Sequence, residues 1–131
     1  MKLVDSLFLI RLLRGFPDAI KKAEEVDALG DAATTVINVF HLSYGIKTMR
    51  DPVRRMEELK RVIANLEVLD LSVEATMKAT EISKTYSNNN VSISPFNALI
   101  AGIALTSGVE ALITRDKEAF RLVSGLKIEN F

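Results

Sequence analysis

An alternation of short apolar segments with segments of helical spacing runs along the whole chain and constrains its fold more than any other feature. The strand candidates are 3–5, 32–37, 66–70, 110–114 and 126–131. The helix candidates are a first helix that ends at Gly15, then 17–29, 39–49, a helix from Pro52, a helix from Ala75 to Tyr86, 96–105 and a short turn at 116–120. Strands that alternate with helices favour a parallel sheet with helices on both faces. We therefore predict an α/β fold in a single domain that covers residues 1–131.

Charge and cysteine content exclude several classes of function. Seventeen basic and seventeen acidic residues give zero net charge, so any polyanion has to be bound locally. The absence of cysteine excludes disulfide frameworks and zinc-thiolate sites. No apolar stretch reaches the roughly 18 residues of a membrane span, and the N-terminus lacks the pattern of a signal peptide. We therefore expect a cytoplasmic protein without a membrane segment.

Two aspartates follow predicted strands at the edge of the sheet where ligands collect. Asp5 ends the first strand, and Asp116 follows the strand at 110–114. Ligands of open parallel sheets bind outside the carboxyl ends of the strands. Two carboxylates in one crevice repel each other, and a divalent cation relieves that repulsion. Capping of the following helices is the alternative interpretation, because aspartate is a common N-cap, and position alone leaves both open.

Four stretches of the chain carry a family pattern: LVDSLFLI, TTVINVFHLSYG, SPFNALIAGIALTSGVEALITRDKEAF and LVSGLKIENF. In order and spacing they resemble a PIN domain, in particular the VapC type of toxin nuclease. That family places an acid after the first strand, a Glu in E-L-x-x-G, an Asp at the start of the buried helix and an Asp in T-x-D. Asp5, Asp116 and Thr114 match this pattern. His41 stands at the glutamate position and Asn97 at the helix-start aspartate position.

The resemblance implies a three-layer PIN-like fold, with a central parallel sheet flanked by helices, and a metal-dependent endoribonuclease. Asp5 and Asp116 would hold Mg²⁺ or Mn²⁺, and Ser6 and Thr114 would orient these ligands by hydrogen bonds. Two of the four expected acids are missing, so we expect weakened metal binding and weakened catalysis.

The two replaced positions each have a functional and a structural interpretation. His41 can ligate Mn²⁺ through a neutral imidazole, and Asn97 can offer a carbonyl oxygen. Without the family pattern, His41 is a polar residue at the edge of an amphipathic helix. Asn97 then bonds to a neighbouring loop, for which 87–90 offers partners.

The resemblance also implies partners: an RNA substrate, an antitoxin-like protein and a second copy in a homodimer. Basic side chains that could contact phosphate are Arg11, Arg14, Lys47, Arg50, Arg54 and Arg55. The alternative for these basic residues is a solvated helix face, because Arg54 with Glu58 and Glu57 with Arg61 have the i,i+4 spacing typical of such a face.

Two other classes of function stay open. The first is an inactive interaction module that keeps the fold to bind an antitoxin-like partner and does not need Mn²⁺. The second is a receiver-like phosphoacceptor domain. That domain would require a second acid beside Asp5, a central-strand Asp and a Lys before a Pro near the end, and the sequence shows none of these.

Overall fold

The computed structural model describes residues 1–28 and 30–131. The strands are β1 (Lys2–Val4), β2 (Ala32–Thr35), β3 (Glu67–Leu69), β4 (Ala111–Ile113) and β5 (Lys127–Glu129). The helices are α1 (Ser6–Leu13), α2 (Pro17–Asp27), α3 (Val36–Ile46), α4 (Pro52–Ile63), α5 (Val73–Asn88), α6 (Pro95–Thr106) and the 3-10 helix η1 (Lys117–Phe120). Residue 29, the last one of the predicted helix 17–29, lies outside the described residues.

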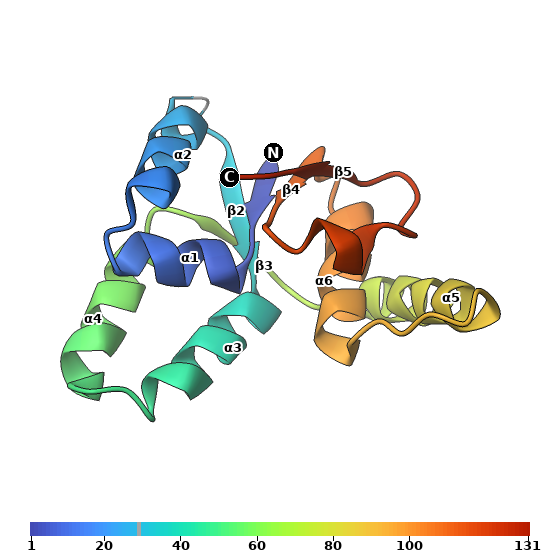
Figure 1. The fold of residues 1–131 in the computed structure, drawn as a ribbon, viewed down its shortest axis with the longest axis horizontal. Coiled ribbons are helices and arrows are strands. Elements are labelled where there is room, and N and C mark those ends of the chain that lie inside the picture. The colour runs from blue at the N-terminus through green and yellow to red at the C-terminus, as the bar shows by residue number, and fades with distance from the viewer. Residues whose placement is uncertain (29) are drawn as a thin grey trace.

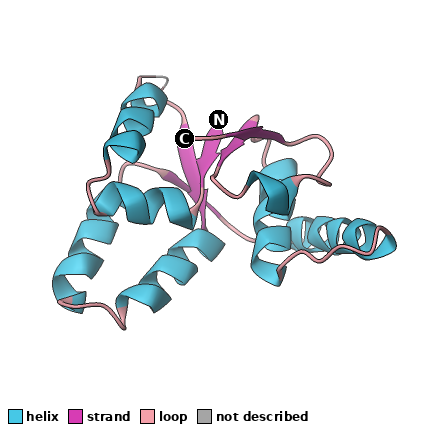
Figure 2. Cartoon of the chain, in the orientation of Figure 1, coloured by secondary structure: helices cyan, strands magenta, loops and turns pink. Residues whose placement is uncertain are grey.

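The strands form one parallel sheet in the order β3-β2-β1-β4-β5. Helices α1 to α4 lie on one side of it, and α5 and α6 lie on the other (Figures 1 and 2). The predicted α/β architecture with a central parallel sheet is therefore confirmed. No helix among residues 1–28 and 30–131 is long and apolar enough to cross a membrane.

Each face of the sheet has its own apolar core. Leu3 of β1 packs in the cluster with α5 and α6, and its neighbour Val4 packs in the cluster with α1 to α4. Leu112 and Ile113 of β4 divide in the same way. Successive side chains of a strand point to opposite faces, so two adjacent apolar residues serve both cores. This is why these short strands read as continuous apolar runs.

Helix α6 is buried, as its nearly all-round apolar sequence predicts. It packs closely against α5 at Gly102, where an added Cβ would lie 2.4 Å from the Ala75 carbonyl oxygen. Ser94 caps the helix by accepting a hydrogen bond from the Asn97 backbone N–H, and Pro95 occupies the first turn. This packing fixes the position of the N-terminal end of α6.

Two predicted boundaries are wrong around α3. The strand predicted at 32–37 ends at Thr35, because its hydroxyl accepts the Asn38 backbone N–H and starts a helix at Val36. The helix predicted at 39–49 ends at Ile46 rather than at 49. Of the other strands, 3–5 is shifted by one residue to Lys2–Val4, 66–70 and 110–114 each lose one residue at either end, and 126–131 is shortened to Lys127–Glu129. Cap chemistry and not β propensity therefore decides where α3 begins.

Candidate active site

Asp5 lies between β1 and α1 and caps the helix. Its carboxylate accepts the Phe8 backbone N–H at 2.8 Å, and only 8% of the residue is exposed. Burial raises the pKa of the Asp5 carboxyl above its ordinary value, and the nearby charge of Asp116 adds to this. Hydrogen bonds from the Thr114 side chain and the Phe8 backbone act in the opposite direction without offsetting burial. The protein therefore carries the cost of a buried carboxylate at this position.

Asp116 lies at the end of the neighbouring strand β4, which is paired with β1 in the register Val4↔Ile113. Its carboxylate caps η1 by accepting the Ala119 N–H at 3.2 Å, and its own backbone N–H donates to Thr114 Oγ1 at 3.0 Å. Thr114 is fully buried, and its side chain also lowers the pKa of the neighbouring Asp5 carboxyl. Both aspartates are caps, and both stand at the same edge of the sheet, where one threonine links them.

The loop that carries Asp116 is attached to α5. Tyr86 is 1% exposed, and its hydroxyl donates to the Ala119 carbonyl at 2.6 Å and accepts the Leu122 N–H at 3.2 Å. The second layer of helices thus supports η1 from behind. Sequence reasoning used Tyr86 only as an apolar position of α5.

His41 and Ser6 meet across α3 and α1. Ser6 Oγ lies 3.1 Å from His41 Nδ1. The imidazole stacks on Phe96 of α6, with ring centroids 5.7 Å apart and planes at 14°. His41 is therefore held between the start of α1, next to Asp5, and the start of α6. Helix spacing alone indicates only a polar residue at the edge of an amphipathic helix and does not indicate these two contacts.

Asn97 is the third residue of α6, directly after Phe96. Its side chain makes no hydrogen bond within residues 1–28 and 30–131, so the predicted bond to the loop at 87–90 is not observed there. The contact between Phe96 and His41 places the start of α6 beside α3. Asn97 thus belongs to the element that reaches the site, and its amide is not used by the neighbouring loop.

Asn38 is a residue that sequence reasoning missed. It is fully buried on α3, and its Oδ1 accepts the Ser6 backbone N–H at 3.1 Å. Its Nδ2 donates to the Val4 carbonyl at 3.4 Å, which also accepts the Thr34 hydroxyl at 2.9 Å. Asn38 therefore connects α3 to the turn that presents Asp5. The capping box requires Glu or Gln three residues after the Thr, so Thr35 and Asn38 do not match it and no local pattern indicated the role of Asn38.

The donor set suits one weakly held divalent ion. Among the described residues no cluster of three or more His, Cys, Asp or Glu side chains could hold a metal. Mg²⁺ is nevertheless often bound by one or two carboxylates together with substrate phosphate. The Asp5 and Asp116 carboxylates fit that pattern. Burial of the Asp5 carboxylate raises its pKa, and a cation beside it would offset that buried negative charge. The amide of Asn97 and the imidazole of His41 are the further donors on neighbouring elements.

Several of the predicted phosphate contacts are engaged in ion pairs. Arg11 pairs with Asp18 at 2.8 Å, Arg55 pairs with Glu58 at 3.2 Å, and Arg54 lies 3.8 Å from Glu58. The expected pair of Glu57 with Arg61 is not found in the described part of the chain, where Glu57 pairs with Lys60. Arg14, Lys47 and Arg50 have no ion pair within residues 1–28 and 30–131.

A family model described as PIN domain matches residues 2–126. The chain belongs to the PIN domain family. The carboxylates at the ends of β1 and β4 therefore lie in a PIN fold, and the resemblance seen in the sequence is confirmed.

Curated relatives and solved structures agree with this assignment. The chain is 26% identical over 95 residues to the tRNA(fMet)-specific endonuclease VapC of Salmonella typhimurium, covering 72% of this chain and 71% of the relative. It is 21% identical over 129 residues to that of Shigella flexneri, covering 98% and 96%. A chain of VapBC2 from Rickettsia felis, bound to promoter DNA, has a TM-score of 0.89 at 20% identity over 99% of this chain and 98% of that one. A chain of DNA-bound VapBC from Salmonella typhimurium has a TM-score of 0.87 at 22% identity, covering 98% and 96%. The PIN-like fold is thus shared over nearly the full length.

Proposed function

We propose that this PIN domain is a VapC-like endoribonuclease, the toxin of a toxin-antitoxin pair, whose metal-dependent catalysis is weakened at two positions. The pairing of Asp5 with Asp116 at the ends of adjacent strands supports the proposal most directly. The names of the curated relatives support the substrate class, since both are tRNA(fMet)-specific endonucleases.

In this proposal Asp5 and Asp116 hold Mg²⁺ or Mn²⁺. An ion held by these two carboxylates would supply an activated water and would stabilise the leaving oxygen of a phosphodiester. Thr114 orients Asp116 by accepting its backbone N–H, and its buried side chain lowers the pKa of the Asp5 carboxyl beside it. Ser6 orients the His41 ring at Nδ1. These contacts restrict the rotamers of the residues that face the substrate.

Catalysis is weakened because a neutral imidazole and an amide stand where the family has carboxylates. Each missing charge removes attraction for the cation and also removes repulsion within the empty cleft. The parent protein should therefore fold well without metal and bind the ion weakly. Residue changes that restore the charge should reverse both properties.

We further propose an antitoxin-like partner, a homodimer and a cytoplasmic location. One structural neighbour is described as a toxin-antitoxin complex from Klebsiella pneumoniae, which supports the antitoxin. Three apolar side chains around α1 and α2 are 39–42% exposed, namely Leu7, Phe16 and Ile20. Such exposed apolar side chains support a surface that a second copy covers in the dimer. A cytoplasmic location follows from an RNA substrate.

An inactive interaction module is the second candidate function. The observation that favours it is the absence, among the described residues, of a cluster of three metal-ligating side chains. Such a module would keep the fold and the partner surface and would gain no stability from Mn²⁺.

Restoring the two carboxylates tests the nuclease against the module. The variant His41→Glu with Asn97→Asp should lose stability without metal and should bind Mn²⁺ at least tenfold more tightly than the parent. At a saturating metal concentration, tenfold tighter binding corresponds to about 1.4 kcal/mol, or about 5 °C in melting temperature for a domain of this size. Thermal unfolding with and without Mn²⁺ measures this change, and cleavage of a structured RNA measures activity.

The matched control is Asn88→Asp, which adds a carboxylate at an exposed position near the end of α5. It should leave the effect of Mn²⁺ unchanged. The two single variants should gain less than half of the double variant's effect each, because the charges cooperate only around the ion. A double variant with neither tighter Mn²⁺ binding nor cleavage would favour the interaction module.

A further inference from the structure

A groove opens between α1 and α3 directly beside the candidate active site. Its volume is about 330 Å³, and its mouth is formed by Ser6, His41 and Tyr44. Its floor is apolar and includes Ile10 and Leu42. Because Ser6 follows Asp5, a ligand in this groove would lie next to a phosphate bound at the carboxylates. The groove is thus placed to contact a substrate on one side of the reacting bond.

Gly45 keeps this groove open. It lies in the last turn of α3 and lines the groove, and an added Cβ would meet no atom within 4 Å. Glycine inside a helix is destabilising relative to alanine. Close packing does not require this glycine, in contrast to Gly102 of α6. Gly45 therefore differs from Gly102 in that the absence of its side chain leaves space in the groove.

Aromatic rings continue from the mouth of the groove across the surface. Tyr44 is 65% exposed and lies 6.0 Å from Phe40, whose ring lies 6.1 Å from Phe96. Phe96 in turn stacks on His41. Exposed rings beside a nuclease site offer the faces on which single-stranded bases stack.

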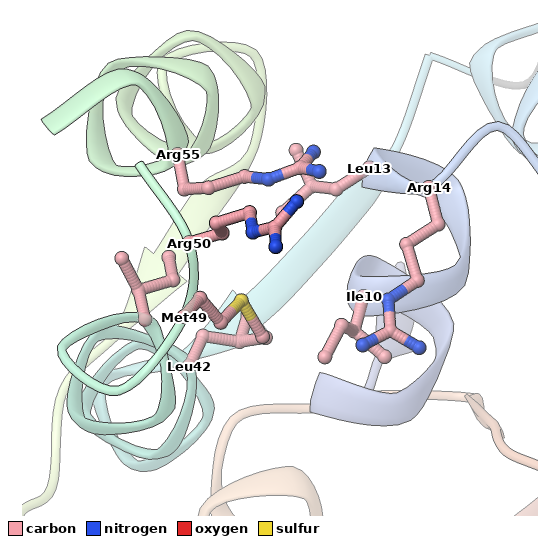
Figure 3. Close-up of a pocket in the computed structure, with 8 residues that line it drawn as sticks. Ile10, Leu13, Arg14, Leu42, Met49, Arg50 and Arg55 are labelled. Atoms are coloured by element: carbon pink, nitrogen blue, oxygen red, sulfur yellow. The ribbon is translucent and has the colours of Figure 1, made fainter. Parts of the chain in front are cut away.

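Cationic side chains surround the far end of the groove. A second pocket of about 220 Å³ shares Ile10 and Leu42 with the first and is bordered by Arg14, Arg50 and Arg55. Figure 3 shows Arg50 and Arg55 on one side of this pocket and Arg14 on the opposite side. Ser6 and Arg14 are eight residues apart, which is roughly 12 Å along a helix axis. A short extended strand of nucleic acid covers that distance.

Resting on the proposed nuclease function, we propose that this groove binds one unstacked base of a single-stranded RNA, with a neighbouring phosphate at Arg14 and Arg50. The chemistry along the groove follows the order of an RNA strand. A carboxylate pair suited to a cation and its phosphate comes first, then an apolar slot with ring faces, and then free cations that suit the next phosphate. The base that fits this slot would then determine which RNA is cut.

Binding of short fluorescent RNA oligomers, followed by anisotropy in the presence of Mg²⁺, tests the proposal without requiring cleavage. The variant Gly45→Leu fills the slot, and Tyr44→Ala removes a ring face at its mouth. Each should weaken binding about tenfold, the size of one base–aromatic stack. Gly45→Ala should produce a smaller loss than Gly45→Leu, since the effect follows the added volume. An oligomer with one abasic site should bind the parent as weakly as the intact oligomer binds Gly45→Leu.

Met77→Ala is the control, because Met77 is 61% exposed on α5, on the other side of the sheet. It should bind RNA like the parent, and thermal unfolding should show that all variants are folded. Equal affinities of the intact and abasic oligomers would overturn the base pocket. A Tyr44→Ala variant that loses self-association in sedimentation but keeps RNA affinity would overturn it too, by assigning the rings to an interface between copies. Binding of an apolar acidic peptide in the groove, together with an RNA affinity that does not depend on the base, would assign the groove to a protein partner instead.

The same measurements separate this proposal from the proposed function. Base-dependent binding without any cleavage by the parent or by the restored His41→Glu, Asn97→Asp variant would contradict the nuclease and leave the base pocket standing. Cleavage without base-dependent binding would contradict the pocket and leave the nuclease standing.

Discussion

Truncation of Asn38 should destabilise the protein and loosen the turn that presents Asp5. The variant Asn38→Ala removes the acceptor of the Ser6 N–H and a donor to the Val4 carbonyl at a fully buried position. The carbonyl keeps the Thr34 hydroxyl at 2.9 Å, so the Ser6 N–H is the group left unpaired.

The magnitude follows from these contacts. A buried N–H without a partner costs about 1–3 kcal/mol, and the space left by the amide adds about 1 kcal/mol. Alanine returns about 0.5 kcal/mol through its higher helix propensity. The expected loss is therefore about 1.5–3.5 kcal/mol. A domain of 131 residues has an unfolding entropy of about 0.28 kcal/mol/K, so the melting temperature should fall by about 5–13 °C.

Calorimetry on Asn38→Ala and on Asn65→Ala provides the comparison. Asn65 is exposed after α4, and its side chain donates only to the Arg61 carbonyl at 3.1 Å. Its truncation should change stability by less than about 0.5 kcal/mol, or about 2 °C. Equal melting temperatures for the two variants would show that Asn38 does not support the turn between β1 and α1, and the structural account of this connection would be wrong.

Three further predictions concern the carboxylate, the helix packing and the assembly. Because burial raises the pKa of Asp5, the folded state binds its proton more tightly than the unfolded state, and the stability from this group is lost as the pH rises through the ordinary and then the raised pKa. The variant Asp5→Asn keeps a good cap, so its free energy of unfolding in urea should rise relative to that of the parent as the pH rises. The same variant should lose the stabilisation by Mn²⁺. Gly102→Ala should lower the free energy of unfolding by about 1–3 kcal/mol, since its Cβ would lie 2.4 Å from the Ala75 carbonyl oxygen; an unchanged denaturation midpoint would contradict that contact. Sedimentation at high micromolar concentration should show a dimer, and a monomer there would contradict the proposed assembly.

The layered architecture could be predicted because each strand and helix carries its own local pattern. The apolar run Ala111–Ile113 is buried throughout, as is typical of a strand in a parallel sheet that is covered on both faces. The end of β2 could not be read in this way, because Val36 and Ile37 favour strands by propensity and nevertheless begin α3. The hydroxyl of Thr35 outweighs their propensity by capping the helix. Tertiary burial of α3 then supports the boundary.

The site was predictable in part for a similar reason. Asp5 follows β1 directly and Asp116 follows β4 after two residues, so the parallel sheet places both at the same edge once strand order is known. The stack of His41 on Phe96 joins residues that are distant in the chain, so no local sequence pattern predicts it. Asn38 was missed because its buried hydrogen bonds to β1 and Ser6 also span a long sequence separation.

The choice of cap residues supports a role for the Asp5 charge beyond capping. Thr35, Ser72 and Ser94 cap α3, α5 and α6 with neutral hydroxyls. Among residues 1–28 and 30–131, the carboxylates that cap a helix by a hydrogen bond are Asp5 and Asp116, after the adjacent strands β1 and β4 at one edge of the sheet, whereas Asp51 before α4 makes no such bond. At Asp5 the cap does not compensate burial, since the pKa of its carboxyl remains raised. A serine or asparagine would cap α1 without that cost. The buried charge at Asp5 is the charge that the proposed cation at this edge would offset.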